Sequence, residues 1–236
     1  MRFLTLSVLL VTAISFGFAQ TGAISGRVLF KGTAPKPKEI SASAMKAADA
    51  KCADLHKGKG VTTEEVVVNP NGTLRWVLVW VKEGVKGTFP SPSKEVVLDQ
   101  VGCIFRPHVI AVQVGQPVVF LNSDPLLHNV RTQSKKGNSF NIAQPLKGSK
   151  QARKFRNPEI GIPIRCDVHF WMVAYLHIIP HPFFAVTGKD GSFTIAGLKP
   201  GTYTVEAWHE KLGTQTQKVT VPPTGTAKVE FVFAAK

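Results

Sequence analysis

The 236-residue sequence has little cysteine, little acidic charge and little helical periodicity. Its three cysteines are too few for a disulfide-built scaffold, and because the number is odd, one thiol is left over even if two pair. Only 15 Asp and Glu oppose 29 Lys and Arg, which gives a net charge of +14. After residue 20 no apolar run is long enough to cross a bilayer. The hydrophobic content of 44% excludes wholesale disorder.

The first twenty residues have the composition of an export signal. Arg2 is their only charged residue, the run that follows is apolar through Phe16, and the small residues Gly17 and Ala19 precede a plausible cleavage position. The pattern predicts a signal peptide over residues 1–19 and a periplasmic or secreted protein with no membrane span after cleavage. An uncleaved membrane anchor is the alternative. In an oxidising compartment two of the cysteines are expected to pair.

Turn residues and short β-rich runs dominate the rest of the sequence, which contains 20 Gly and 16 Pro. Apolar runs such as 117–122 and 173–179 are separated by turn signals, and only residues 41–56 have the pattern of a helix. This predicts an all-β fold of antiparallel sandwiches. Because the composition shifts near Pro180, we expect a first strand within 20–36, a larger central domain at 37–180 with its core at 61–179, and a smaller sandwich at 181–236.

A thiol, an imidazole and a thioether stand within seven residues of one another, at Cys166, His169 and Met172. Sulfur ligands together with imidazole suit copper, which takes a trigonal plane of two His and one Cys with a weak axial Met. That geometry needs a second histidine, and His128, just past the strand expected at 117–122, is the candidate. A structural zinc site is disfavoured, because one Cys with two His and a Met is a poor tetrahedral set.

Residues 112–129 (VQVGQPVVFLNSDPLLHN) and the C-x2-H-x2-M loop together resemble the cupredoxins, the blue-copper proteins of the amicyanin and plastocyanin type. The resemblance implies a Greek-key β-sandwich that binds one type 1 copper. The implied ligands are His128, Cys166 and His169 in the plane and Met172 on the axis. Asn129 is implied as a brace of the ligand loop, and such outer contacts tune a metal site.

The same resemblance implies that electrons leave through the imidazole edge of His169. Amicyanin-like loops have a proline after this histidine, and Phe170 stands there instead. A bulkier ring at this position puts the redox potential and the docking face in doubt, but not the ligand set.

The other two cysteines, Cys52 and Cys103, are expected to form a structural disulfide, with two buried free thiols as the alternative. His108 begins an expected strand, and a half-exposed strand histidine is the favoured interpretation. A second metal or substrate contact is the alternative for His108. The remaining histidines have no ligand-like neighbours and are expected to be surface or packing residues: His56, His177, His181 and His209.

The C-terminal part resembles the carboxypeptidase regulatory-like, or transthyretin-like, β-sandwich. The resemblance depends on the D-G-x-F turn at 190–193 and the L-x-P-G-x-Y-x-V run at 198–205. Residues 22–28 (GAISGRV) resemble the opening strand of the same module. If both hold, the copper domain is inserted within the sandwich, and a tandem arrangement remains the alternative. Such modules say little about activity.

Eight Lys and Arg and no acidic residue lie in the loop-rich stretch 131–156, which follows His128. A solvated basic face or electrostatic steering toward an acidic partner explains it, and nucleic acid is disfavoured.

The first hypothesis is an exported type 1 copper protein, not an enzyme, that passes electrons to a redox protein such as a c-type cytochrome or a periplasmic dehydrogenase. A copper-binding or carbohydrate- or protein-binding scaffold is the alternative. A multicopper enzyme is disfavoured because the sequence has no H-x-H pair.

Overall fold

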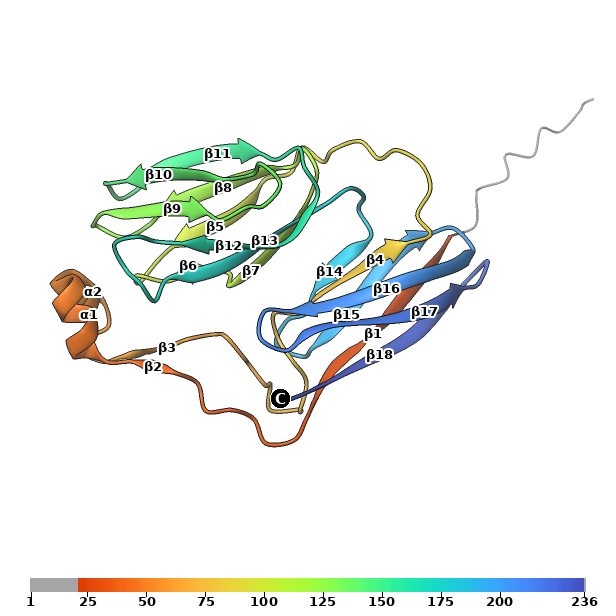
Figure 1. Cartoon of the computed structure of the whole chain (residues 1–236), viewed down its shortest axis with the longest axis horizontal. Helices are drawn as coiled ribbons and strands as arrows, with labels where there is room; N and C mark the ends of the chain where they lie inside the picture. The colour runs from red at the N-terminus through yellow and green to blue at the C-terminus, as the bar shows by residue number, and fades with distance from the viewer. Residues whose placement is uncertain (1–20, 236) are drawn as a thin grey trace, which may run out of the picture.

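The computed structural model describes residues 21–235, so the signal peptide predicted at 1–19 lies outside the described residues. Two β-sandwiches lie side by side, and a pair of short helices stands at one end (Figure 1). The predicted all-β class is confirmed. Within residues 21–235 no helix has both the length and the apolar character needed to cross a membrane. In chain order the elements are β1 (Gly22–Lys31), β2 (Glu39–Ile40), α1 (Ala42–Ala48), α2 (Ala50–Leu55), β3 (Val61–Thr62), β4 (Leu78–Glu83), β5 (Val96–Gln100), β6 (Phe105–Arg106), β7 (Val109–Gln113), β8 (Pro117–Asn122), β9 (His128–Thr132), β10 (Phe140–Gln144), β11 (Lys150–Lys154), β12 (Glu159–Arg165), β13 (Val173–Ile179), β14 (Phe184–Val186), β15 (Ser192–Leu198), β16 (Gly201–His209), β17 (Gly213–Val221) and β18 (Thr226–Ala234).

The central sandwich comprises β5 to β13. One sheet has the order β10-β9-β12-β13-β7 and the other has the order β11-β8-β5-β6. The pairs β13–β7 and β5–β8 are parallel, and the remaining pairs are antiparallel. Alternate side chains of the inner strands point between the sheets, as the two-residue period of a strand requires. Phe120, Ile164 and Leu176 are fully buried there.

The terminal sandwich comprises β1, β4 and β14 to β18. Its sheets have the orders β15-β1-β18 and β14-β4-β16-β17. Strand β1 lies between β15 and β18, pairing antiparallel with the first and parallel with the second. The N-terminal strand therefore completes the C-terminal sandwich, and the central sandwich is inserted within it. Its core contains the fully buried Ile24, Val205 and Phe231.

The expected domain limits need a correction at β4. This strand falls inside the segment 37–180 that was expected to be the copper domain, but it pairs with β14 and β16 of the terminal sandwich. A short apolar strand has no local feature that identifies the sheet it will join, because strand pairing is a non-local choice.

Two expectations about local structure also differ from the fold. The basic stretch expected to be loop-rich contains two strands, the half-buried β10 and the largely exposed β11. The helix expected at 41–56 is divided at Asp49, which is extended, with φ −155° and ψ 119°. The Asp49 carboxylate accepts a hydrogen bond from the Lys51 N–H and so caps α2, while Ser41 caps α1. Aspartate and serine are preferred caps because their oxygens satisfy free helical N–H groups.

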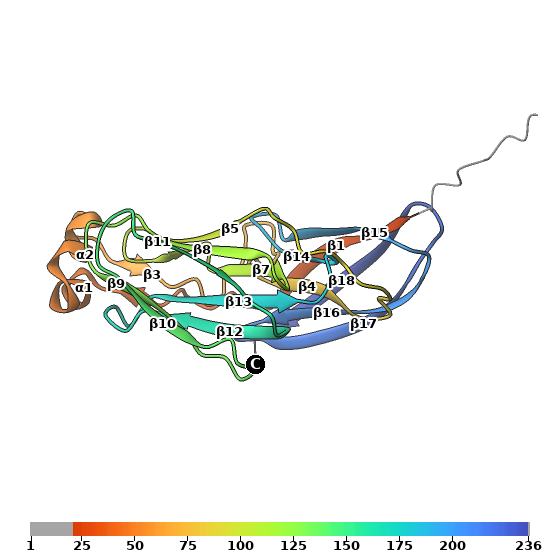
Figure 2. The same ribbon diagram turned by 90° about the horizontal axis from the view of Figure 1, so that it is seen from above.

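Residues 39–62 form one compact unit, called the cover below. It contains β2, α1, α2 and β3, and Figures 1 and 2 show its helices at the end of the central sandwich away from the terminal sandwich. Met45, Cys52 and Ala53 are buried against the central core. The predicted disulfide between Cys52 and Cys103 is confirmed, with a Cα–Cα distance of 5.8 Å. This bond ties α2 to the loop before β6.

His177 and Trp208 pack together where the two sandwiches meet. Their ring centroids are 4.6 Å apart and the rings are nearly perpendicular, at 75°. The Gly161 N–H donates to Nδ1 of His177 at 3.0 Å, so the proton of the neutral ring is on Nε2. Nε2 has no hydrogen-bond partner among the described residues.

His108 does not stand half-exposed on a strand. It lies one residue before β7, is 5% exposed, and pairs with the buried carboxylate of Glu210 from the terminal sandwich. The expectation of a half-exposed strand histidine was wrong because the partner that buries it is 102 residues away in the sequence. The pair joins the two sandwiches.

Candidate metal centre

His128 is the first residue of β9 and is fully buried. The loop before it is held by Asn122, whose amide donates to the carbonyls of Leu126 and Gln144 at 2.9 Å each. The ring Nε2 of His128 lies 2.9 Å from the Asp124 carboxylate. That carboxylate also accepts the Gly102 and Cys103 N–H groups, both at 2.7 Å. With Nε2–H directed at Asp124, the Nδ1 atom of His128 is the one that faces the site.

The loop between β12 and β13 brings Cys166, His169 and Met172 together in a tight turn. The Met172 N–H donates to the His169 carbonyl at 2.9 Å, and the Cys166 N–H donates to the Met172 carbonyl at 3.3 Å. Asn129 braces this loop: its side-chain oxygen accepts the Asp167 N–H at 2.6 Å, and its amide donates to the Asp167 carboxylate at 3.0 Å. Asp167 in turn forms an ion pair with Arg131 at 2.7 Å.

The three predicted in-plane residues converge at one point. Nδ1 of His128 is 3.0 Å from Nδ1 of His169, and Sγ of Cys166 is 3.6 Å from the same His169 atom. One ligand atom from each residue lies within 4.8 Å of the other two. The exposed fractions of the three side chains are 0%, 0% and 4% for His128, His169 and Cys166.

Met172, the predicted axial residue, is 1% exposed and belongs to the same core cluster as Cys166. Two imidazole nitrogens and a thiol that face each other in a buried site form a donor set that fits copper, and the buried Met172 of the same loop supplies a thioether.

The surroundings favour the thiolate form of Cys166. Burial alone would raise its pKa, but hydrogen bonds with His128 and His169 and with backbone N–H groups lower it to about 6. Burial likewise opposes the charged form of His128, and its bonds to Asp124 and Cys166 outweigh that effect and raise its pKa. Burial alone would raise the pKa of Asp124, but its hydrogen bond with His128 and the bonds from the Cys103 and Gly102 N–H groups lower it. A low thiol pKa is what a metal-ligating cysteine requires.

The imidazole edge of His169 is not exposed, contrary to expectation. The ring is fully buried, and the Asp49 carboxylate of the cover lies 4.0 Å from its Nε2. The sulfurs of Cys52 and Cys103 also lie within 4.8 Å of a ring nitrogen of His169. The cover thus closes the side from which a partner was expected to approach. The neighbouring Phe170 is 64% exposed.

Sequence reasoning did not identify three of these neighbours as site residues. Asp124 stands four residues before His128, so the D-x3-H spacing is the signal that could have found it. Asp49 and Trp171 have no such signal. Trp171 packs on His169 with ring centroids 5.3 Å apart, and Asp49 reaches it from a distant segment.

Comparison with known proteins gives one family match. Residues 181–234 match the family model of the carboxypeptidase regulatory-like domain. The match covers the part of the terminal sandwich that follows the central sandwich, so the predicted resemblance is confirmed. The N-terminal β1 and the intervening β4, which lie outside the matched residues, complete the sheets of the terminal sandwich. No curated protein matches the sequence.

Solved structures that are similar to this chain include cupredoxins. A copper-containing nitrite reductase from Thermus scotoductus SA-01 is 23% identical over 42% of this chain and 25% of its own, with a TM-score of 0.33. A purple cupredoxin from Nitrosopumilus maritimus is 20% identical over 36% and 97%, with a TM-score of 0.30. A reduced variant of amicyanin is 19% identical over 36% and 81%, with a TM-score of 0.32. The match spans only a quarter of the nitrite reductase chain. The metal centre of this protein is therefore assigned from the geometry of its own residues.

Proposed function

We propose that this protein is an exported type 1 copper protein that transfers single electrons between redox partners and transforms no substrate. The observation that carries the proposal is the convergence of two imidazole Nδ1 atoms and one thiol in a buried site. The proposed in-plane ligands are His128, Cys166 and His169, and the proposed axial ligand is Met172. Copper held there would supply a Cu(II)/Cu(I) couple that accepts and releases one electron.

The protein's own residues hold this site nearly rigid. Asp124 fixes the ring of His128, and Asn129 fixes the ligand loop through both the backbone and the side chain of Asp167. Because the ligands are held in place by hydrogen bonds rather than by the metal, they move little when the charge of the site changes. A set of four protein ligands also leaves no position open for a substrate.

We propose a redox protein with an acidic docking face as the partner, such as a c-type cytochrome or a periplasmic dehydrogenase. The support is the exposed cationic strand β11, which contributes Lys150, Arg153 and Lys154 to the central sandwich. Opposite charge on a partner would accelerate encounter, and the acceleration would decline at high salt. The predicted signal peptide and the Cys52–Cys103 disulfide support a periplasmic or secreted location.

Visible spectroscopy tests the proposed function. The copper-loaded protein should show an intense thiolate-to-copper charge-transfer band that disappears on reduction and returns on oxidation. Cys166→Ala should abolish the band. Alanine in place of the exposed Val97 on β5 is the matched control and should leave the band unchanged. Persistence of the band in Cys166→Ala would refute the assignment.

Copper holding without electron transfer is a second candidate function. The complete burial of His169 beneath the cover favours it, because a covered ligand hinders contact with a protein partner. Voltammetry separates the two candidates: a reversible one-electron wave supports electron transfer, and tight copper binding without such a wave supports the holding function.

A further inference from the structure

The cover leaves the proposed copper site with few routes to solvent. Nε2 of His169 is buried and has no hydrogen-bond partner among the described residues. Asp49 and the Cys52–Cys103 disulfide lie against the ring from the cover side. His128 is also fully buried. An electron that reaches the site must therefore pass through one of the residues packed around these two imidazoles.

Trp171 is the largest of these residues, and it is held firmly. Its indole Nε1 donates to the Cys103 carbonyl at 2.9 Å, next to the disulfide. Its ring lies against His169, with centroids 5.3 Å apart and a tilt of 54°. The adjacent Phe170 packs nearly perpendicular to the indole, with ring centroids 5.1 Å apart. Trp171 thus lies between the buried His169 and the molecular surface, which it can reach in two directions, toward Phe170 and toward a pocket.

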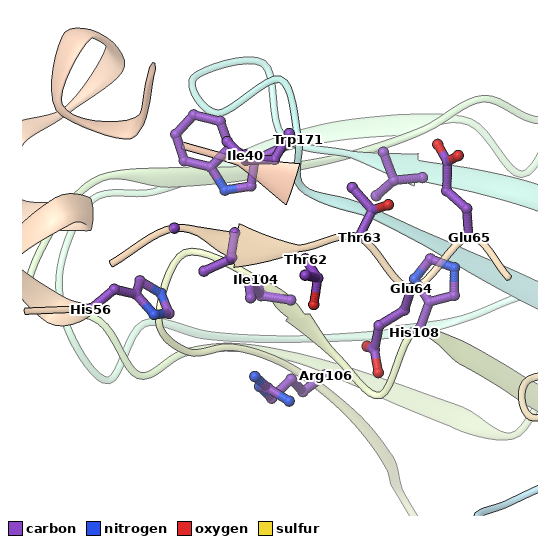
Figure 3. Close-up of a pocket in the computed structure, with 13 residues that line it drawn as sticks. Ile40, His56, Thr62, Thr63, Glu64, Glu65, Ile104, Arg106, His108 and Trp171 are labelled. Atoms are coloured by element: carbon purple, nitrogen blue, oxygen red, sulfur yellow. The ribbon is translucent and has the colours of Figure 1, made fainter. Parts of the chain in front are cut away.

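One of these directions is a pocket of about 350 Å³ between the cover and the central sandwich. Figure 3 shows Trp171 and Ile104 among the residues that line it, with Thr62 from the cover and Glu64 from the segment that follows it. Trp171 is 8% exposed, so the pocket reaches its surface. The volume is at the lower end of the range for small-molecule sites, which suits a one-ring compound and excludes a protein.

The lining of the pocket points to a class of ligand. Trp171, Ile40 and Ile104 provide apolar surface for a ring, and Glu64 and Glu65 provide carboxylates that can accept hydrogen bonds from hydroxyl groups. One oxygen of Glu65 is paired with Lys211 at 3.3 Å. Glu64 already accepts a bond from Trp76 through one oxygen, at 3.3 Å, which leaves the other available.

We propose that this pocket binds a one-ring aromatic reductant bearing hydroxyl groups, and that Trp171 relays its electron to the metal centre. The inference rests on the proposed function and names the donor class for that same site. With hydroquinone as donor, each molecule reduces two copper sites in succession, becomes benzoquinone and releases two protons to solvent. Trp171 is a relay residue and is regenerated unchanged.

The kinetic test follows the reduction of the Cu(II) protein by hydroquinone in a stopped-flow instrument, using the decay of the charge-transfer band. Trp171→Leu should lower the second-order rate constant about tenfold or more, which is about 1.4 kcal/mol in activation free energy. Phe170→Leu, in the same loop, is the matched control and should leave it within about twofold. The visible spectrum and the midpoint potential of both variants should equal those of the wild type, which excludes a merely structural effect of Trp171.

A second pair of variants tests the pocket without altering Trp171. Thr62→Trp should fill the opening and slow the reduction, whereas Thr216→Trp, at an exposed position of a terminal-sandwich strand, should not. The metal-free protein gives an independent readout. Resorcinol, an isomer of hydroquinone that is much harder to oxidise, should shift the indole N–H resonance of Trp171 in the wild type and not in Thr62→Trp.

The outcomes distinguish this inference from the proposed function. Absence of a charge-transfer band in the wild type refutes the copper assignment, whatever resorcinol does. A normal band with equal rates for wild type, Trp171→Leu and Thr62→Trp refutes the relay and its pocket alone. A slower reaction of Phe170→Leu, with Trp171→Leu unchanged, would place the electron route at the exposed ring instead. If Trp171→Leu fails to fold, the Thr62→Trp rate and the resorcinol shift decide the matter.

Discussion

Removal of the Cys52–Cys103 disulfide should destabilise the protein and loosen the cover first. The bond closes a loop with a sequence separation of 51, for which the loss of loop-closure entropy in the unfolded chain corresponds to about 4 kcal/mol at 25 °C. The change to make is the double variant Cys52→Ala and Cys103→Ala, which leaves Cys166, the proposed ligand, untouched. The native contacts of the cover persist in part, because Met45 and Ala53 remain apolar and buried.

Urea unfolding of the variant and the wild type, both without metal, gives the free energy of unfolding. We expect a decrease of about 3–5 kcal/mol with little change in the rest of the fold. Hydrogen exchange should locate the effect: amides of residues 42–55 should lose protection before those of β8 and β13, since local opening precedes global unfolding. A decrease below about 1 kcal/mol, or a uniform loss of protection across the central sandwich, would refute the reasoning.

Three further predictions concern the sandwich interface and the loop brace. Burial lowers the pKa of His177 to about 3, so the unfolded chain binds more protons between about pH 3 and 6.5. Stability should therefore rise with pH across that window, by up to about 5 kcal/mol, and His177→Leu should flatten the slope of unfolding free energy against pH; an unchanged slope contradicts the burial argument. Gly161→Ala should cost about 1–3 kcal/mol in chemical unfolding, because its φ is +74° and a Cβ would lie 2.9 Å from Trp208, whereas Gly188→Ala, with open space around it, should cost under about 0.5 kcal/mol; equal costs would refute the clash. Asn129→Ala should weaken copper binding about 10–100-fold in a chelator competition, and undiminished affinity would show that the brace is dispensable.

The strands nearest the site were predictable from the sequence because their apolar runs are bounded by clear turn signals. Residues 117–122 and 173–179 form β8 and β13 with the expected limits. The loop with Cys166, His169 and Met172 indicated a metal site only in combination with the D-x3-H-N pattern that ends at 129, because copper needs a second histidine beside the thiolate and thioether. The structure brings two of them together with His128 across the sandwich.

What could not be predicted depends on contacts between distant segments. Strand β11 is exposed and basic, so it lacks the apolar alternation that identifies a half-buried strand. The sheet that β4 joins could not be predicted either, because a short apolar strand could pair within any of several sheets. The covering of His169 requires Asp49 to cross to the ligand loop, and no local pattern near residue 49 encodes that contact. The burial of His108 depends in the same way on Glu210.

A Cu(II) titration of the metal-free protein, followed by visible and electron paramagnetic resonance spectroscopy, tests the central claim most directly. The convergence of His128, Cys166 and His169 predicts that an intense thiolate-to-copper band grows linearly and stops at one equivalent, with a single paramagnetic species. Saturation without such a band, or a band that continues to grow beyond one equivalent, would contradict a type 1 copper centre at these residues.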